Sequence, residues 1–171
     1  RKTDFDLKLV AYAGVLVSVD ARLPNPFFAE ALEREQLAPF QGCQGSEREV
    51  SLGESRIDFR LTMSDGCLWV ETKSVTLVED GVALFPDAPT ARGSRHVQTL
   101  VNAVQDGSRS AVVFVVQRPD ARCFAPYDAA DRTFGKALRA AADAGVDVYA
   151  WTCRVSKEAI TVNRQIPVNL A

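Results

Sequence analysis

Two acidic residues and a lysine lie on neighbouring segments whose alternating apolar and polar residues are typical of a β-hairpin. Asp58 belongs to the first segment, and Glu71 and Lys73 stand two positions apart in the second. Residues two apart on a strand project from the same face. Carboxylate oxygens are ligands that Mg²⁺ prefers, and a nearby amine can orient water or stabilise charge developing on a phosphate. The pattern indicates metal-assisted phosphodiester hydrolysis, with Asp58 and Glu71 holding Mg²⁺ or Mn²⁺ and Lys73 acting on the water or phosphate.

The same charges have a second interpretation, because charged residues on an exposed strand face commonly pair across strands. A two-residue turn at Asp65 and Gly66 places Asp58 opposite Lys73 and Arg60 opposite Glu71. In this interpretation the charges only balance one another. The other face of the hairpin collects the residues expected to form a core surface: Ile57, Phe59, Leu61, Met63, Leu68 and Val70.

Glu30 is a third acidic candidate. It lies on a segment where Asn25 and Pro26 indicate a helix start, with Asn25 as the N-cap. Glu30 joins the site if this helix packs beside the hairpin, and is otherwise an exposed helix residue.

Arg92, Arg95 and His96 open a further segment with helical periodicity, and a helix N-terminus with arginines suits phosphate binding. Residues 91–118 carry four arginines against one acidic residue, a local charge of +3. The alternatives are a solvated basic face for the arginines and a structural, hydrogen-bonded role for His96.

The elements that must position these residues follow from the rest of the chain. A helix is expected over residues 90–105, and the run Ala111–Val116 has no alternation, as in a strand covered on both faces. A second helix over residues 128–144 leads into a strand at residues 146–151. Two short strands, residues 5–12 and 15–19, are expected across Gly14. The order predicts an α/β fold with a partly parallel, mixed sheet flanked by helices.

Composition excludes several classes of protein. The 171 residues fit one domain, and 20 basic against 22 acidic residues exclude nucleic-acid binding through bulk positive charge. Four separated cysteines and one histidine argue against zinc. No apolar run approaches the roughly 18 residues of a membrane span and no signal peptide is recognisable, so we expect a cytoplasmic protein without membrane contact. The abrupt start suggests that an N-terminal part is missing.

Four motifs in the chain resemble the sugar fermentation stimulation protein (SfsA) family, and the resemblance extends from Leu7 to Leu170. They are Ser55–Phe59, Val70–Leu77, Phe85–His96 and Phe114–Asp120. The resemblance implies an N-terminal OB-like domain followed by a PD-(D/E)XK nuclease-like domain with a restriction-endonuclease-like fold. Residues 1–171 resemble the second domain only, as a single domain.

The resemblance also implies a metal site matched here by Glu30, Asp58 and the pair Glu71 and Lys73. Ile57 departs from the superfamily pattern, in which proline often precedes the aspartate. The family is described as binding DNA without sequence preference and as influencing sugar (maltose) utilisation genes. We therefore expect a DNA-binding protein with a Mg²⁺-dependent nuclease site. The alternatives are a non-catalytic DNA-binding regulator and a sugar sensor, although the chain has no Gly-rich phosphate loop.

Overall fold

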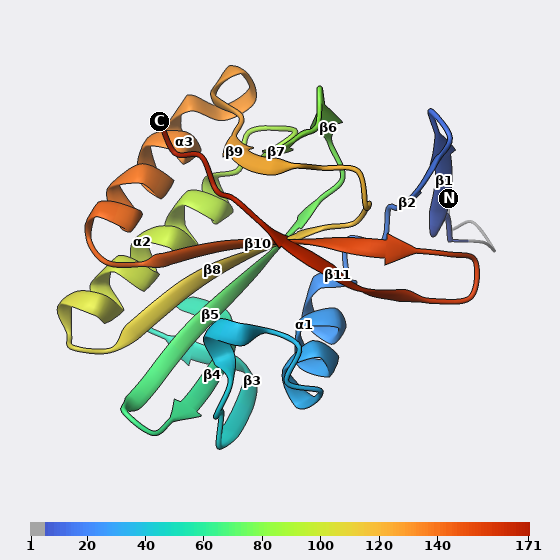
Figure 1. Ribbon diagram of the computed structural model, residues 1–171. Helices are drawn as coiled ribbons and strands as arrows, with labels where there is room; N and C mark the ends of the chain where they lie inside the picture. The colour runs from blue at the N-terminus through green and yellow to red at the C-terminus, as the bar shows by residue number, and fades with distance from the viewer. Residues whose placement is uncertain (1–5) are drawn as a thin grey trace.

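A six-stranded mixed sheet forms the centre of the computed structural model, which describes residues 6–171 (Figure 1). Its spatial order is β11-β10-β8-β5-β4-β3. The pairs β5–β8 and β8–β10 are parallel, and the remaining pairs are antiparallel. The strands are β3 (Gly45–Leu52), β4 (Ser55–Met63), β5 (Gly66–Val75), β8 (Arg109–Val116), β10 (Asp147–Val155) and β11 (Ile160–Ile166). The expected mixed α/β fold is confirmed.

Helices cover both faces of this sheet. Helix α1 (Pro24–Glu33) lies on one face, and α2 (Ala91–Gln105) and α3 (Asp128–Asp143) pack together on the other (Figure 1). Every residue from Ala111 to Val116 is at most 1% exposed, because alternate side chains of β8 enter the two cores. One of these cores joins α2, α3 and β8, and it includes Leu100, Phe114, Phe134 and Leu138.

Smaller elements surround the sheet. They are β1 (Leu9–Tyr12), β2 (Val15–Ser18), the 3₁₀ helix η1 (Ala38–Phe40), β6 (Val78–Glu79), β7 (Val82–Phe85) and β9 (Cys123–Pro126). The expected strands across Gly14 are present as β1 and β2, and Phe5 lies outside the described residues. Within residues 6–171 the longest helix, α3, has 16 residues, and none of the helices is suited to spanning a bilayer.

The hairpin of β4 and β5 forms with a register two residues from the predicted one. Met63 pairs with Gly66 across a turn at Ser64 and Asp65, so Arg60 faces Trp69 rather than Glu71. The predicted turn is wrong because Gly66, at φ 131°, begins the returning strand instead of closing the turn. A shift of two residues does not by itself exchange the two faces, and five of the six predicted apolar residues share the α1-side core. Ile57 alone packs on the α2 side.

Candidate metal and phosphate site

The site lies where β4 separates from β5. The paired register runs from Met63 and Gly66 to Phe59 and Val70. One residue further on, the Asp58 carboxylate accepts the backbone N–H of Thr72 at 2.8 Å and the Thr72 hydroxyl at 2.8 Å. Asn25, in the first turn of α1, donates its amide N–H to the other Asp58 oxygen at 3.0 Å. Three hydrogen bonds from two elements therefore hold the Asp58 carboxylate at this point.

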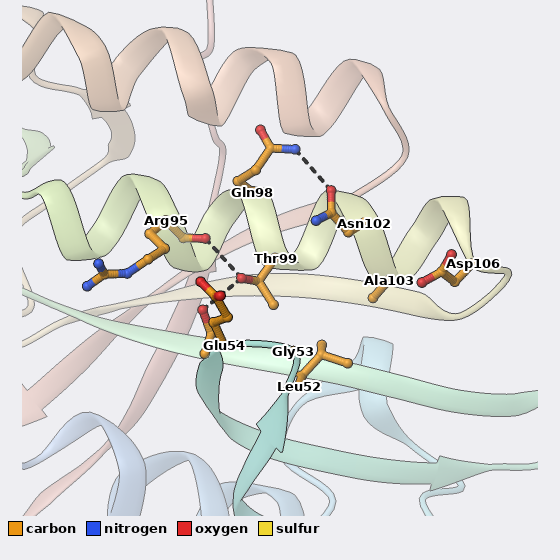
Figure 2. Close-up of a pocket in the computed structure, with 10 residues that line it drawn as sticks. Leu52, Gly53, Glu54, Arg95, Gln98, Thr99, Asn102, Ala103 and Asp106 are labelled. Carbon is orange, nitrogen blue, oxygen red and sulfur yellow. Dashed lines mark hydrogen bonds between the residues drawn. The ribbon is translucent and has the colours of Figure 1, made fainter.

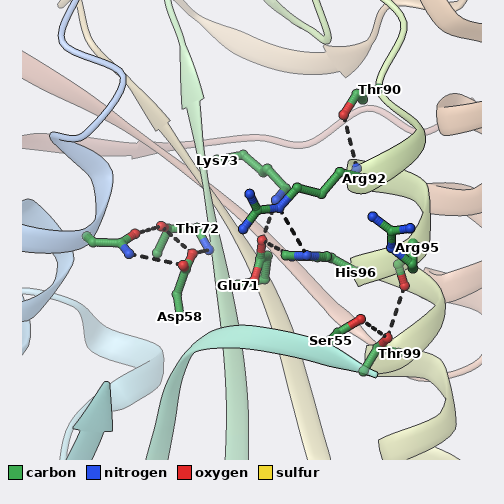
Figure 3. A network of polar contacts seen from close by, with 12 residues as sticks. Ser55, Asp58, Glu71, Thr72, Lys73, Thr90, Arg92, Arg95, His96 and Thr99 are labelled. Carbon is green, nitrogen blue, oxygen red and sulfur yellow. Dashed lines mark hydrogen bonds and ion pairs between the residues drawn. The ribbon is translucent and has the colours of Figure 1, made fainter. Parts of the chain in front are cut away.

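Glu71 reaches towards the opposite side of β5, where α2 lies (Figure 3). Its side chain is buried, with the whole residue only 2% exposed. Lys73 Nζ and His96 Nδ1 both contact the Oε1 atom, His96 at 2.5 Å. The Oε2 atom is buried without a hydrogen-bond partner. A buried, unpartnered carboxylate oxygen is costly, so it is well suited to accept a ligand that carries positive charge.

The two carboxyl groups have opposite pKa perturbations. Burial and the negative charge of Glu71 raise the pKa of Asp58, against the lowering effect of its hydrogen bonds from Thr72 and Asn25. Burial also acts to raise the pKa of Glu71, but the contacts from His96 and Lys73 outweigh it and lower that pKa. A divalent cation between the groups would favour the ionised form of both.

A cavity of about 460 Å³ is lined by both Asp58 and Glu71, together with Lys73, Thr72 and Arg92. Among residues 6–171 no group of three His, Cys, Asp or Glu side chains gathers as a ready-made metal cage. Mg²⁺ is nevertheless commonly bound by one or two carboxylates with water completing its shell. The donor set of Asp58 and Glu71, with Oε2 of Glu71 unpartnered, fits such an ion.

The structure does not bring Glu30 to this cluster. The Glu30 side chain is 59% exposed and pairs with Arg34 at 2.8 Å, and it lines a different cavity. Asn25 is the residue of α1 that reaches Asp58, and Glu30 lies about 140° further around the helix. Asn25 is not the N-cap either, because the helix begins at Pro24 with Leu23 as its cap. Its amide is therefore free for the site, a role that sequence reasoning missed.

The three predicted phosphate-binding residues of α2 have different surroundings. Arg92 lines the carboxylate cavity. Arg95 lines a separate cavity of about 450 Å³ between α2 and the turn joining β3 to β4, beside Gln98 and Asn102 (Figure 2). His96 is 4% exposed and contacts Glu71 instead of the cavity. Of the three, only Arg92 lines the cavity that Asp58 and Glu71 also line.

Comparison with known proteins identifies the relatives of this chain. A model of the sugar fermentation stimulation protein RE domain matches residues 22–159. A sugar fermentation stimulation protein homolog from Chloroflexus aggregans is 48% identical over 98% of this chain and 65% of that protein. A homolog from Desulforamulus reducens is 44% identical over 99% of this chain and 71% of that protein. The chain thus spans about two thirds of the length of these relatives.

Structural comparison agrees with the sequence comparison. Pyrococcus furiosus SfsA, solved in complex with Ca²⁺, is 33% identical and superposes with a TM-score of 0.92, over 99% of this chain and 74% of that one. The match covers the central sheet, its helices and the strands that carry the carboxylates. This chain belongs to the sugar fermentation stimulation protein family.

Proposed function

We propose that this domain binds DNA without sequence preference and hydrolyses it with the help of Mg²⁺ or Mn²⁺ held by Asp58 and Glu71. The observation that carries the proposal is the buried, unpartnered Oε2 of Glu71, facing no protein donor in a site that also contains Asp58. The Ca²⁺ complex of the related Pyrococcus furiosus protein supports a divalent cation here. Such an ion supplies polarisation of the phosphate and an activated water when bound.

The side chains around the cavity have separate roles in this proposal. Asn25 and Thr72 hold the Asp58 carboxylate in place through their hydrogen bonds. Arg92 binds a non-bridging phosphate oxygen. The amine of Lys73 orients water or offsets the charge that develops on the phosphate.

DNA contact depends on few basic groups. Of the four arginines in residues 91–118, Arg109 pairs with Asp65 at 3.0 Å and Arg118 with Asp120 at 2.7 Å. Arg92 and Arg95 form no ion pair with residues 6–171. With a net charge of −2 for the whole chain, we expect weak and strongly salt-dependent binding through these two arginines.

A second candidate function is a non-catalytic DNA-binding regulator with the same fold. The contact of Lys73 with Glu71 favours it, because a lysine engaged in an ion pair balances charge without any chemistry. From the family resemblance we further propose that the protein regulates sugar (maltose) genes and is cytoplasmic. We also propose that it works together with an N-terminal OB-like domain.

Degradation of single- and double-stranded DNA separates the two functions. Wild type and Glu71→Gln are compared with Mg²⁺ and with Mn²⁺, alone and with the N-terminal part of the family restored. We expect wild type to cleave and Glu71→Gln to be inactive. Glu30→Gln is the matched control, because it makes the same change on an exposed helix face. Metal-dependent DNA binding without cleavage would establish the regulator, and absence of metal binding would refute the site.

A further inference from the structure

We propose that His96 is a positioning residue that, with Lys73, makes Glu71 a one-oxygen metal ligand, and that Arg92 sets the imidazole tautomer this requires. The inference rests on the metal site proposed above. It concerns how neighbouring side chains orient the Glu71 carboxylate towards a metal ion. It assigns His96 to the carboxylate instead of to phosphate, since the side chain is buried behind Glu71.

The two oxygens of Glu71 differ completely in their contacts. Oε1 accepts from both Lys73 Nζ and His96 Nδ1. A carboxylate oxygen has about two lone-pair sites, so Oε1 is saturated. Oε2 is buried and accepts from no protein group. A cation held by Glu71 would therefore meet Oε2, and the two donors on Oε1 prevent the carboxylate from turning.

The contacts of His96 fix which ring nitrogen carries the proton. The guanidinium of Arg92 can only donate, and its Nε points at His96 Nε2 at 3.3 Å. Nε2 is therefore the acceptor of this contact, and Nδ1 carries the N–H that is directed at Glu71. A proton on Nε2 would set two donors face to face.

Helix geometry explains why these residues cooperate. Arg92 and His96 are four residues apart on α2, so their side chains meet on one helix face. The helix is anchored at its start by Thr90, whose hydroxyl accepts the Gly93 N–H at 3.0 Å. Arg92 also lines the carboxylate cavity. His96 therefore contacts both Arg92, which we propose binds phosphate, and Glu71, which we propose binds the metal.

The tautomer can be measured directly because His96 is the only histidine in the chain. A long-range ¹H–¹⁵N correlation spectrum of ¹⁵N-labelled protein therefore shows one imidazole. We expect protonated Nδ1 and bare Nε2, both without metal and with Ca²⁺ at mildly alkaline pH. A protonated Nε2 in the Ca²⁺-loaded protein would overturn the proposal. If wild type binds no Ca²⁺, the proposed metal site is refuted. The spectrum of the metal-free protein still tests whether Arg92 and Glu71 set the tautomer of His96.

Two isosteric variants test the positioning role. In His96→Asn the amide N–H occupies the place of Nδ1–H and can donate to Glu71, whereas in His96→Gln the amide reaches the place of Nε2. We expect Ca²⁺ affinity, measured by calorimetry, to fall about 10- to 100-fold in His96→Gln and to be largely retained in His96→Asn. Thermal unfolding without metal shows whether each variant is folded.

Equal Ca²⁺ affinity in wild type and both folded variants would refute the positioning role, and so would an equal loss in both. If either variant fails to fold, the wild-type imidazole spectrum decides alone. DNA cleavage is not needed for any of these measurements. A failure of catalysis and a failure of this inference are therefore distinguishable.

Discussion

Replacing Asp58 by asparagine removes one of the two negative charges of the site, that of a half-buried carboxylate, and keeps the size of the side chain. In the metal-free protein the pKa of Asp58 is raised by burial and by Glu71. A carboxyl group whose pKa is raised on folding stabilises the folded state while protonated, and this contribution is lost as pH rises through the interval between its unfolded and folded pKa values. Without metal, wild type therefore loses stability relative to Asp58→Asn as pH rises towards neutral.

With metal, wild type is stabilised more than Asp58→Asn. A ligand at 100 times its dissociation constant stabilises the folded state by about 2.7 kcal/mol. For a chain of this length each kcal/mol shifts the melting temperature by about 2–4 °C, so wild type gains roughly 5–11 °C. If the loss of Asp58 weakens the metal 100-fold, the same concentration supplies only about 0.4 kcal/mol. The gain for Asp58→Asn then falls to roughly 1–2 °C.

The assay is thermal unfolding of both proteins with a Ca²⁺ titration and with chelator, repeated across mildly acidic to neutral pH. Asp65→Asn is the matched control, because it makes the same change at an exposed turn where Asp65 pairs with Arg109. The control keeps the wild-type metal response. The reasoning is refuted if Asp58→Asn keeps the full Ca²⁺ shift. It is also refuted if, without metal, the melting temperature of wild type does not fall relative to that of Asp58→Asn as pH rises towards neutral.

Three further outcomes are expected. Lys73→Ala lowers Mn²⁺-dependent DNA cleavage about 100-fold or more while Ca²⁺ binding persists; cleavage at the wild-type rate would leave Lys73 as a charge-balancing residue. Calorimetry finds weaker Ca²⁺ binding in Asn25→Ala, which loses a hydrogen bond to Asp58, but not in Glu30→Ala, and the opposite ranking would restore Glu30 to the site. Joint replacement of Arg92 and Arg95 by alanine weakens DNA binding and flattens its salt dependence by about one unit per lost phosphate contact; an unchanged slope would make both arginines structural.

The fold was predictable wherever side-chain periodicity decides it. The run Ala111–Val116 contains no polar side chain, so both of its faces must be covered, and the structure buries it between two cores. Glu71 and Lys73 were expected on one face because a strand repeats every two residues, and their side chains are in contact. Asp58 was expected on that face too, but it hydrogen-bonds to Asn25 of α1, whereas Glu71 contacts His96 of α2. The predicted register nevertheless differs from the observed one, since Gly66 fits either a turn or the first position after it.

The site was predictable only in part, because helix phase depends on packing. Glu30 and Asn25 lie on the same ten-residue helix, and only docking against β5 shows that Asn25 faces the carboxylate. The direction of the His96 side chain likewise depends on how α2 packs against the sheet. Its place beside two arginines indicates a phosphate site, whereas α2 turns it inward against Glu71. No local pattern encodes either orientation.

The parallel pairing of β5 with β8 determines when in folding the site is complete. Asp58 and Glu71 come from one hairpin, which forms through local contacts, but His96 and Arg92 lie on the crossover of residues 76–108 that joins β5 to β8. Closing this connection is slow compared with forming the hairpin. A cation that needs the whole site would therefore bind late in folding. It would change the folding rate little and would prolong the lifetime of the folded domain by slowing unfolding.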